Sequence, residues 1–289
     1  MIYSISHTTD YTSEILSSCK EGTVHSVYRK TINLKIGSYI LALQAAASPL
    51  SPISLITTLD EKSMADLSVT AGQMVNIENS TINISAPEAD IHFKYFNAPL
   101  FSSKLFPVTD FDKCLPVLQQ VLNSSRSNGF RTLFGNTGPM HAPVSGLDLS
   151  LVLTSADSRI SKCTTLFKQK FYEDAAMELT HLLGLGIGLT PSGDDFLCGV
   201  LAGLILCGKS SHPFSRCLKA GLLKHLSDTN DISQAFLMCA LHSHFSQAVK
   251  NLTSSCSAED ILTGFEAIGH SSGIDTLCGI FYAVSLYYV

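Results

Sequence analysis

The sequence predicts an α+β protein, with a mostly β domain at residues 1–105 and a mainly α-helical domain at residues 106–289. Two observations support this division. Short runs rich in β-branched residues, bounded by Gly, Ser, Pro and Asn, fill the first part and are typical of strands. Apolar residues at helical spacing fill the second part. We therefore expect a small barrel or sandwich, followed by a set of packed helices.

Alternation of apolar and polar residues predicts strands throughout the first hundred residues. The alternating segments are 22–34, 39–43, 53–57, 74–77, 81–85 and 91–96. A short helix is expected before them, around residues 11–20, and Ser48–Pro52 is expected to form a turn with a restricted backbone. About five to seven short strands separated by turn signals are typical of either a barrel or a sandwich.

Helical spacing of apolar residues begins after residue 105, first at Asp112–Leu122. Further helices are expected at 146–155, 158–183, 194–208, 213–226, 231–250, 258–268 and 275–288. Between them lies a stretch rich in Gly, Asn and Pro at Ser127–Pro143, which we expect to be a long loop over a functional site. Arg131 and His141 lie in this loop and are candidate ligand contacts.

The composition excludes several classes of function. The chain is 45% hydrophobic and only 15% charged, which favours a subunit interface because few charges remain to cover the surface. Nineteen Lys and Arg against 24 Asp and Glu give a net charge of −5, and no basic cluster indicates a nucleic-acid partner. No segment resembles a signal peptide or membrane span, and the nine cysteines form no C-x-x-C pair. A cytoplasmic protein with reduced thiols is therefore expected.

The most informative stretch is Gly-Leu-Gly-Ile-Gly-Leu-Thr-Pro-Ser-Gly-Asp-Asp at Gly184–Asp195. Its alternating glycines allow a tight turn and a close approach of the backbone to a ligand. Thr190, Ser192 and Asp194 then place hydroxyls and a carboxylate just ahead of an apolar helix. A helix start carries unpaired N–H groups and a partial positive charge, which suit an anion. Ser and Asp are also ordinary N-caps, so a purely structural role is the alternative.

A second copy of this motif follows eighty residues later. Ser192–Gly199 and Ser272–Gly279 share the pattern Ser-Gly-x-Asp-x-Leu-Cys-Gly, with six identities in eight positions. His270 and Ser271 precede the second copy, and an apolar helical run follows each copy. We expect the two loops to face each other across one cleft, although a structural repeat of two helices also explains the match.

These two loops supply most of the candidate site residues. His25, in the first alternating segment, is a further candidate because a strand can project it into a site; a hydrogen-bonded structural histidine is the alternative. The candidates for binding an anion are Gly186, Gly188, Thr190, Ser192, Gly193, Ser271, Ser272, Gly273 and His25.

The motifs at 184–197 and 269–279 resemble a bacterial family long described as a domain of unknown function, which includes AllH, a subunit of the oxamate carbamoyltransferase of anaerobic allantoin degradation. Val24–Tyr28 and Thr229–Ser233 also resemble family features, so the resemblance covers most of the chain. It implies a transferase of purine catabolism, which moves a carbamoyl group between an oxalurate-type ureide and phosphate. It also implies other protein subunits or a homo-oligomer as partners.

The chemistry implied by this resemblance assigns roles to the polar residues. Amide N–H groups at two helix starts would stabilise the developing oxyanion. His270 is the best candidate for a general acid or base, because histidine titrates near neutral pH. Asp194, Asp195 and Asp275 would repel an anion and need another role. They could bind Mg²⁺ with substrate oxygens, act as catalytic acids or bases, as we expect for Asp195 and Asp275, or simply cap helices.

Three hypotheses follow from the sequence. The first is an oxamate carbamoyltransferase-like subunit that binds a small anionic substrate or phosphate. The second is a non-catalytic subunit that binds a small anion or serves as a scaffold. The third is a metal-dependent hydrolase, which would require divalent metal at the aspartates. No cofactor is certain from the sequence, and Mg²⁺ is the one candidate.

Overall fold

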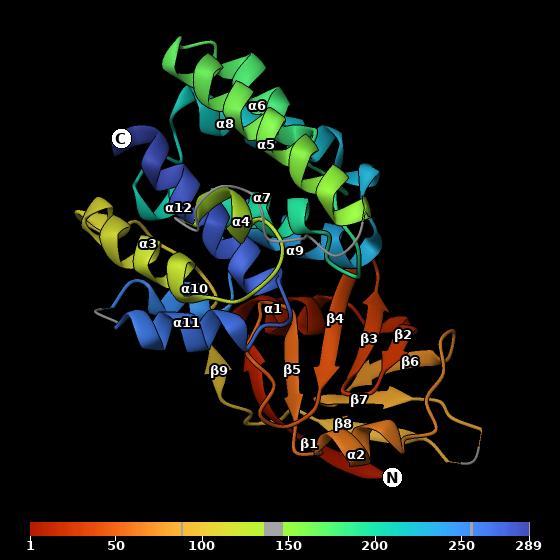
Figure 1. Cartoon of the computed structure of the whole chain (residues 1–289). Coiled ribbons are helices and arrows are strands. Elements are labelled where there is room, and N and C mark those ends of the chain that lie inside the picture. The colour runs from red at the N-terminus through yellow and green to blue at the C-terminus, as the bar shows by residue number, and fades with distance from the viewer. Residues whose placement is uncertain (88, 136–146, 255–256, 289) are drawn as a thin grey trace. The chain divides into compact units, whose positions relative to one another are not determined.

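The computed structural model describes residues 1–87, 89–135, 147–254 and 257–288 (Figure 1). The chain divides into two compact units, Met1–Lys104 and Leu105–Val289. Each unit has its own hydrophobic core, and the two cores share no residue. The expected α+β fold class is confirmed, because the first unit is a barrel and the second is helical. His141 lies outside the described residues.

The N-terminal unit is an eight-stranded barrel within its described residues (Figure 1). Its strands are β1 (Ile2–Thr9), β2 (Glu21–Tyr28), β3 (Thr31–Ile36), β4 (Tyr39–Gln44), β5 (Ser54–Thr57), β6 (Met74–Glu78), β7 (Thr81–Ile84) and β8 (Ile91–Lys94). They hydrogen-bond in the order β5-β4-β3-β2-β6-β7-β8-β1, and antiparallel pairing of β1 with β5 closes the barrel. The remaining elements are the short strand β9 (Leu100–Phe101), which pairs with β1, and the helices α1 (Asp10–Ser18) and α2 (Glu61–Ala65).

The alternating segment 22–34 forms a hairpin of two strands. A turn at Arg29 and Lys30 separates β2 from β3, and Tyr28 pairs with Thr31 across it. The inward side chains of β3 and β4, such as Leu34 and Leu41, are fully buried, whereas polar residues alternate with them on β3. The alternation predicts these inward positions for a barrel wall, but Asn33 on β3 and Ile40 and Ala42 on β4, on the other face, are buried as well.

The C-terminal unit is helical throughout its described residues apart from short turns and loops. Its elements are η1 (Phe111–Cys114), α3 (Leu115–Ser124), α4 (Arg131–Phe134), α5 (Leu147–Lys168), α6 (Tyr172–Thr180), α7 (Ser192–Leu206), α8 (Pro213–Lys224), η2 (Leu226–Asp228), α9 (Asp231–Leu241), α10 (Gln247–Asn251), α11 (Ala258–Glu266) and α12 (Ser272–Tyr288). No helix in the described ranges is both long and apolar enough to cross a membrane.

Two of the expected helices, 158–183 and 231–250, are each broken in the structure. Lys170 and Ser243, at the breaks, both have a φ of 66°. This left-handed conformation is unfavourable for residues other than glycine and ends a right-handed helix. Apolar spacing continues across such a break, and for this reason the sequence pattern predicted continuous helices.

Helices α7 and α12 pack closely against each other in the core of the unit. Gly199 and Gly279, the last residues of the two motif copies, lie at the contact. A Cβ on Gly199 would collide with the carbonyl oxygen of Thr276, and one on Gly279 would collide with that of Phe196. The final glycine of the repeat is therefore required by the approach of the two backbones.

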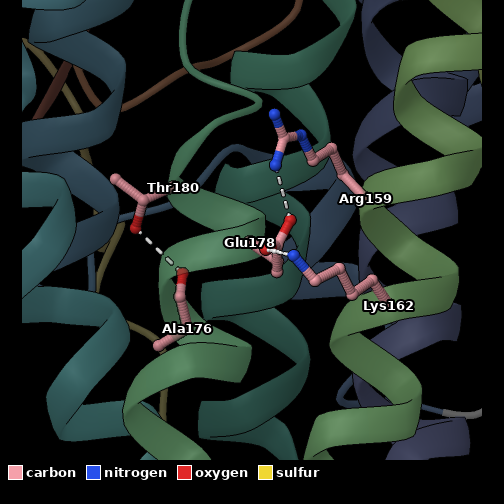
Figure 2. Close-up of polar contacts among 5 residues, drawn as sticks. All are labelled: Arg159, Lys162, Ala176, Glu178 and Thr180. Atoms are coloured by element: carbon pink, nitrogen blue, oxygen red, sulfur yellow. Dashed lines mark hydrogen bonds and ion pairs between the residues drawn. The ribbon is translucent and has the colours of Figure 1, made fainter.

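Ion pairs join α6 to α5 through one buried carboxylate (Figure 2). Glu178 on α6 has a side chain that is only 8% exposed, and its oxygens lie 2.7 Å from Arg159 Nη1 and 2.5 Å from Lys162 Nζ. Thr180, two residues later, donates its hydroxyl to the carbonyl of Ala176. These contacts fix the orientation of α6, because its single buried charge has both partners on one neighbouring helix.

Candidate functional site

The two copies of the motif meet in the structure. α7 begins at Ser192 and α12 at Ser272, and both helices start on the same side of their contact. The hydroxyls of Thr190 and Ser272, one from each copy, lie 2.8 Å apart. The two helix starts therefore bring together their partial positive charges and two hydroxyl-rich loops. On α7 the N–H groups of Gly193, Asp194 and Asp195 already donate to the carbonyls of Leu185 and Pro191.

A cavity of about 350 Å³ lies beside these helix starts. Three segments and one helix form its walls. The lining residues are Gly186, Ile187 and Ser192 from the first loop, His270 and Ser271 from the second, Arg126–Gly129 between α3 and α4, and Leu149 and Val152 from α5. Of the predicted site residues that the structure describes, Gly186, Ser192, His270 and Ser271 line the cavity, and the others do not.

Asp195 and Asp275 are the aspartates that the two copies share, and each lies close to a serine hydroxyl of the other copy. The hydroxyls of Ser272 and Thr190 lie close enough to Asp195 to lower its pKa, and that of Ser192 does the same for Asp275. The serine that begins each copy thus serves the acid of the other copy. The sequence repeat becomes a pair of crossed contacts at the start of the two helices.

Burial dominates the protonation of both acids. It raises the pKa of Asp195 well above its ordinary value, ahead of repulsion by Asp275 and against the lowering effect of the nearby hydroxyls. Burial also raises the pKa of Asp275 to about 7, against hydrogen bonds from Ser192, the backbone of Phe130 and Ser271. The Oδ2 atoms of both acids are buried without a hydrogen-bond partner among the described residues. In their protonated form these acids would not repel an anion.

Asp194 has a different environment from its neighbour. It is 2% exposed, its Oδ1 accepts the N–H of Gly184 at 2.8 Å, and its Oδ2 accepts the hydroxyl of Thr229 at 2.5 Å. Asn230 caps α9 next to this contact, through bonds to two backbone N–H groups. Asp194 therefore ties the glycine-rich loop to the start of α9, with both of its oxygens occupied.

Glycine is required in the two loops for two separate structural reasons. Gly186 and Gly188 have φ angles of 136° and 106°, which favour glycine in a tight loop. Gly193 and Gly273 are buried, and a Cβ on them would collide with the carbonyl oxygens of Leu182 and Phe265, respectively. Close packing against the preceding segment is thus enough to require glycine at these two positions.

The predicted histidine and arginine candidates occupy distinct places. The side chain of His270 is exposed at the cavity wall. His25 sits at an irregularity in the register of β2 in the N-terminal unit, with its Nδ1 3.0 Å from Ser26 Oγ. Arg131 donates to the carbonyl oxygens of Ser127 and Leu122, at 3.1 and 3.4 Å. The guanidinium of Arg131 therefore supports the backbone of the cavity wall.

The wall between α3 and α4 was predicted only in part, because the loop expected over a functional site begins at Ser127 and leaves out Arg126. Gly129 has a φ of 118°, and a Cβ there would lie 2.6 Å from Oδ1 of Asp275. The Asn128-Gly129 dipeptide is a recognisable turn signal within that expected loop. Arg126 belongs to no motif and had no signal in the sequence. Both residues reach the cavity only because α3 packs near α12.

The donor set does not favour Mg²⁺. Within the described ranges, no three His, Cys, Asp or Glu side chains are grouped so as to hold a metal ion. Asp194 has both oxygens bonded to protein groups, and burial favours the protonated forms of Asp195 and Asp275. A hard cation requires ionised carboxylates or other free oxygens. No step is therefore assigned to a metal.

Comparison with known families covers both units of the chain. Residues 182–284 match a family model described as oxamate carbamoyltransferase subunit AllH. Residues 3–99 match a model described as the AllH family N-terminal domain. The first match includes both motif copies and the starts of α7 and α12, and the second includes all of the barrel strands except Ile2. No solved structure matches the chain.

Proposed function

The chain belongs to the AllH family, and from this premise we propose that it is a subunit of an oxamate carbamoyltransferase-like enzyme that binds a small anion at the two helix starts. The observation that carries the proposal is the meeting of α7 and α12 at one cavity, which Ser192 and Ser271 line. Helix starts offer N–H donors and partial positive charge, which suit carboxylate or phosphate oxygens.

Protonation of the buried acids makes this anion site electrostatically reasonable. Ionised carboxylates at Asp195 and Asp275 would oppose the positive ends of the helices and repel a bound anion. Because burial raises the pKa of both acids, they oppose the positive helix ends less than two fully ionised carboxylates would. A neutral carboxylic acid also carries a proton that it can donate.

The proposed reaction transfers a carbamoyl group between an oxalurate-type ureide and phosphate. A phosphate oxygen bonds to the carbamoyl carbon, the bond from that carbon to the ureide nitrogen breaks, and the nitrogen leaves with a proton as the amide of oxamate. The developing oxyanion would be stabilised by N–H groups at the helix starts. His270 at the wall and Asp275 beneath it are the candidate proton donors and acceptors.

The subunit description of the family implies other protein partners, and we propose that this chain assembles with them or with copies of itself in the cytoplasm. The loop that lines the cavity exposes Ile187 and Leu189, with exposed fractions of 73% and 51%. Two neighbouring apolar side chains at the edge of a site are typical of a surface that another protein covers.

A non-catalytic anion-binding subunit is the second candidate function. The buried Oδ2 atoms of Asp195 and Asp275 lie behind the cavity wall, and neither residue lines the cavity. This placement favours a binding role, in which the acids position the hydroxyls while another subunit supplies the reacting groups. A metal-dependent hydrolase has no comparable observation in its favour.

The anion site is tested by binding experiments on the full chain. Phosphate and oxamate at about 100 times their dissociation constant should each raise the free energy of unfolding by about 2.7 kcal/mol. The double variant S192A/S271A should lose most of this stabilisation. Ser285→Ala is the matched control, because this hydroxyl lies far along α12 and bonds to the carbonyl of Phe281. Absence of stabilisation in the wild-type chain would refute the site. Turnover by the chain alone would exclude the non-catalytic alternative.

A further inference from the structure

Arg126 supplies a full positive charge to the cavity wall. Its side chain is exposed, and it makes no hydrogen bond or ion pair with any residue that the structure describes. Apart from His270, the other lining residues are uncharged. Arginine keeps its charge at any pH that a protein withstands, and its five N–H donors are therefore available to a ligand here.

The segment that carries Arg126 is fixed on both sides. Ser125 donates its hydroxyl to Glu266 at 2.9 Å, and Ser127 donates its hydroxyl to the carbonyl of His270 at 2.9 Å. Beyond them, the N–H of Phe130 donates to Asp275 at 2.8 Å, and the Phe130 ring packs in the core. None of these bonds involves the guanidinium. The backbone at Arg126 is therefore fixed, while the side chain is available to a ligand.

Asp275 lies behind the same wall and contacts several of the residues that line it. Asp275 is fully buried, and its Oδ2 has no partner among the described residues. Its carboxyl group lies against Gly129, and the hydroxyls of Ser192 and Ser271 affect its pKa. All three of these neighbours line the cavity. Asp275 therefore connects the wall that carries Arg126 to the starts of α7 and α12.

We propose that Arg126 binds the carboxylate of the substrate and determines the preference of the site for a small carboxylate over phosphate. This inference rests on the proposed anion-binding function. The walls are chemically unequal: Arg126 and Asn128 stand on one, and the helix starts with Ser192 and Ser271 stand on another. A short acid amide such as oxamate likewise has one charged planar end and one neutral end. Phosphate distributes its charge over all of its oxygens.

The geometry of the guanidinium explains why arginine is suited to this role. Its two parallel N–H bonds match the two oxygens of a planar carboxylate. A lysine at the same position would keep the charge and lose the fork. Comparing the two substitutions therefore separates a requirement for charge from a requirement for shape.

The test measures oxamate and phosphate binding by isothermal titration calorimetry on the full chain and on three variants. R126Q should weaken oxamate binding about tenfold or more, and R126K should weaken it by a smaller factor, since the ammonium keeps one charge–charge contact. Phosphate binding should change by less than about threefold in both, because the helix starts supply its donors. The control R216Q removes an exposed arginine on α8 that does not line the cavity, and both affinities should be unchanged.

Each failure has a distinct meaning. If the wild-type chain binds neither anion, the proposed function fails and the inference fails with it. If the wild type binds oxamate and R126Q binds it equally well, the inference is wrong and the anion site stands. Equal losses for oxamate and phosphate would show that Arg126 provides general charge without determining preference. Full affinity in R126K would show that the two parallel N–H donors of the guanidinium are not required. Circular dichroism of each variant verifies that the fold is retained.

Discussion

Asp275 has no exposed surface, and this burial determines its protonation. Its pKa rises to about 7, compared with an ordinary value of 3.8. Between about pH 4 and pH 7 the folded chain therefore holds a proton at Asp275 that the unfolded chain releases. Asp195 shifts in the same direction, because it too is raised chiefly by burial. Wherever the folded state binds more protons, stability falls as pH rises.

Replacing Asp275 by Asn should flatten this pH dependence. Each retained proton contributes a slope of up to about 1.4 kcal/mol per pH unit to the free energy of unfolding. The wild-type contribution is greatest below pH 4, falls up to about pH 7 and is constant above it. D275N lacks the titrating group and should lose this slope, while Asp195 continues to supply its own. Urea denaturation at several pH values from 4.5 to 8 measures the difference.

Asp10 provides a control, because its pKa is lowered and its contribution to stability therefore depends on pH in the opposite direction. Burial tends to raise its pKa, but hydrogen bonds from Ser103, Tyr11 and Ser102 outweigh that effect and lower it. Its contribution to stability is present above its unfolded pKa and is lost as the pH falls below about 4. D10N should therefore change stability most at neutral pH and leave the slope between pH 5 and 7 intact. An unchanged slope in D275N would show that Asp275 is ionised throughout this range.

Local pattern explains which site residues could be predicted. Ser192, Ser271 and His270 were predicted as site residues because the repeat is contiguous in the sequence, and the structure places all three at the cavity wall. Arg126 was missed because it precedes the Ser127–Pro143 loop and belongs to no motif. The bond from Phe130 to Asp275 joins residues separated by 145 positions. The exchange of hydroxyls between the two copies likewise depends on how α7 and α12 cross, which no local pattern encodes.

At the scale of elements, the contact between α7 and α12 depends on Gly199. Replacing it by Ala should lower the free energy of unfolding by about 3 kcal/mol or more, because the new Cβ would collide with the carbonyl of Thr276. The matched control is Gly264→Ala on α11, where the new Cβ would lie 3.8 Å from that of Ala248. There the better helix propensity of alanine should stabilise by about 0.5–1 kcal/mol. Similar effects of both substitutions in urea denaturation would rule out this account of the contact.

The motif therefore combines structural and site positions. Gly193, Gly199, Gly273 and Gly279 are all required by close backbone contacts. The serine and aspartate positions are those that gather around the cavity. A repeat of glycines spaced six residues apart is what two closely crossing helices need, whether or not a ligand binds. The sequence identified the repeat but could not divide it between these two causes.

The ion pairs of Glu178 join α5 and α6 (Figure 2). Burial tends to raise the pKa of Glu178, but Lys162 and Arg159 outweigh it and lower the pKa. E178Q should reduce the free energy of unfolding by about 1 kcal/mol, a modest loss because both cations remain partly solvated. The control is Glu61→Gln, whose ion pair with Arg29 is exposed on both sides and should cost about 0.5 kcal/mol or less. Equal losses in thermal and urea unfolding would show that burial of Glu178 adds nothing.

At the scale of the whole molecule, the change in pattern near residue 105 separates two units with independent cores. The sequence predicted strands followed by helices because the hydrophobic period changes there. It did not choose between barrel and sandwich. That choice depends on the pairing of β1 with β5, for example Ile5 with Thr57, which joins segments about fifty residues apart in sequence. Alternation specifies the inward face of each strand and leaves such long-range pairings open.

Independent cores lead to a final prediction, that the fragment 105–289 folds alone and binds phosphate and oxamate as the full chain does. All described residues that line the cavity, from Arg126 to Ser271, belong to this fragment. Cooperative urea unfolding would establish that it is folded, and calorimetry would compare its affinities with those of the full chain, within about threefold. A folded fragment that binds more than about tenfold more weakly, a loss of about 1.4 kcal/mol, would contradict this prediction.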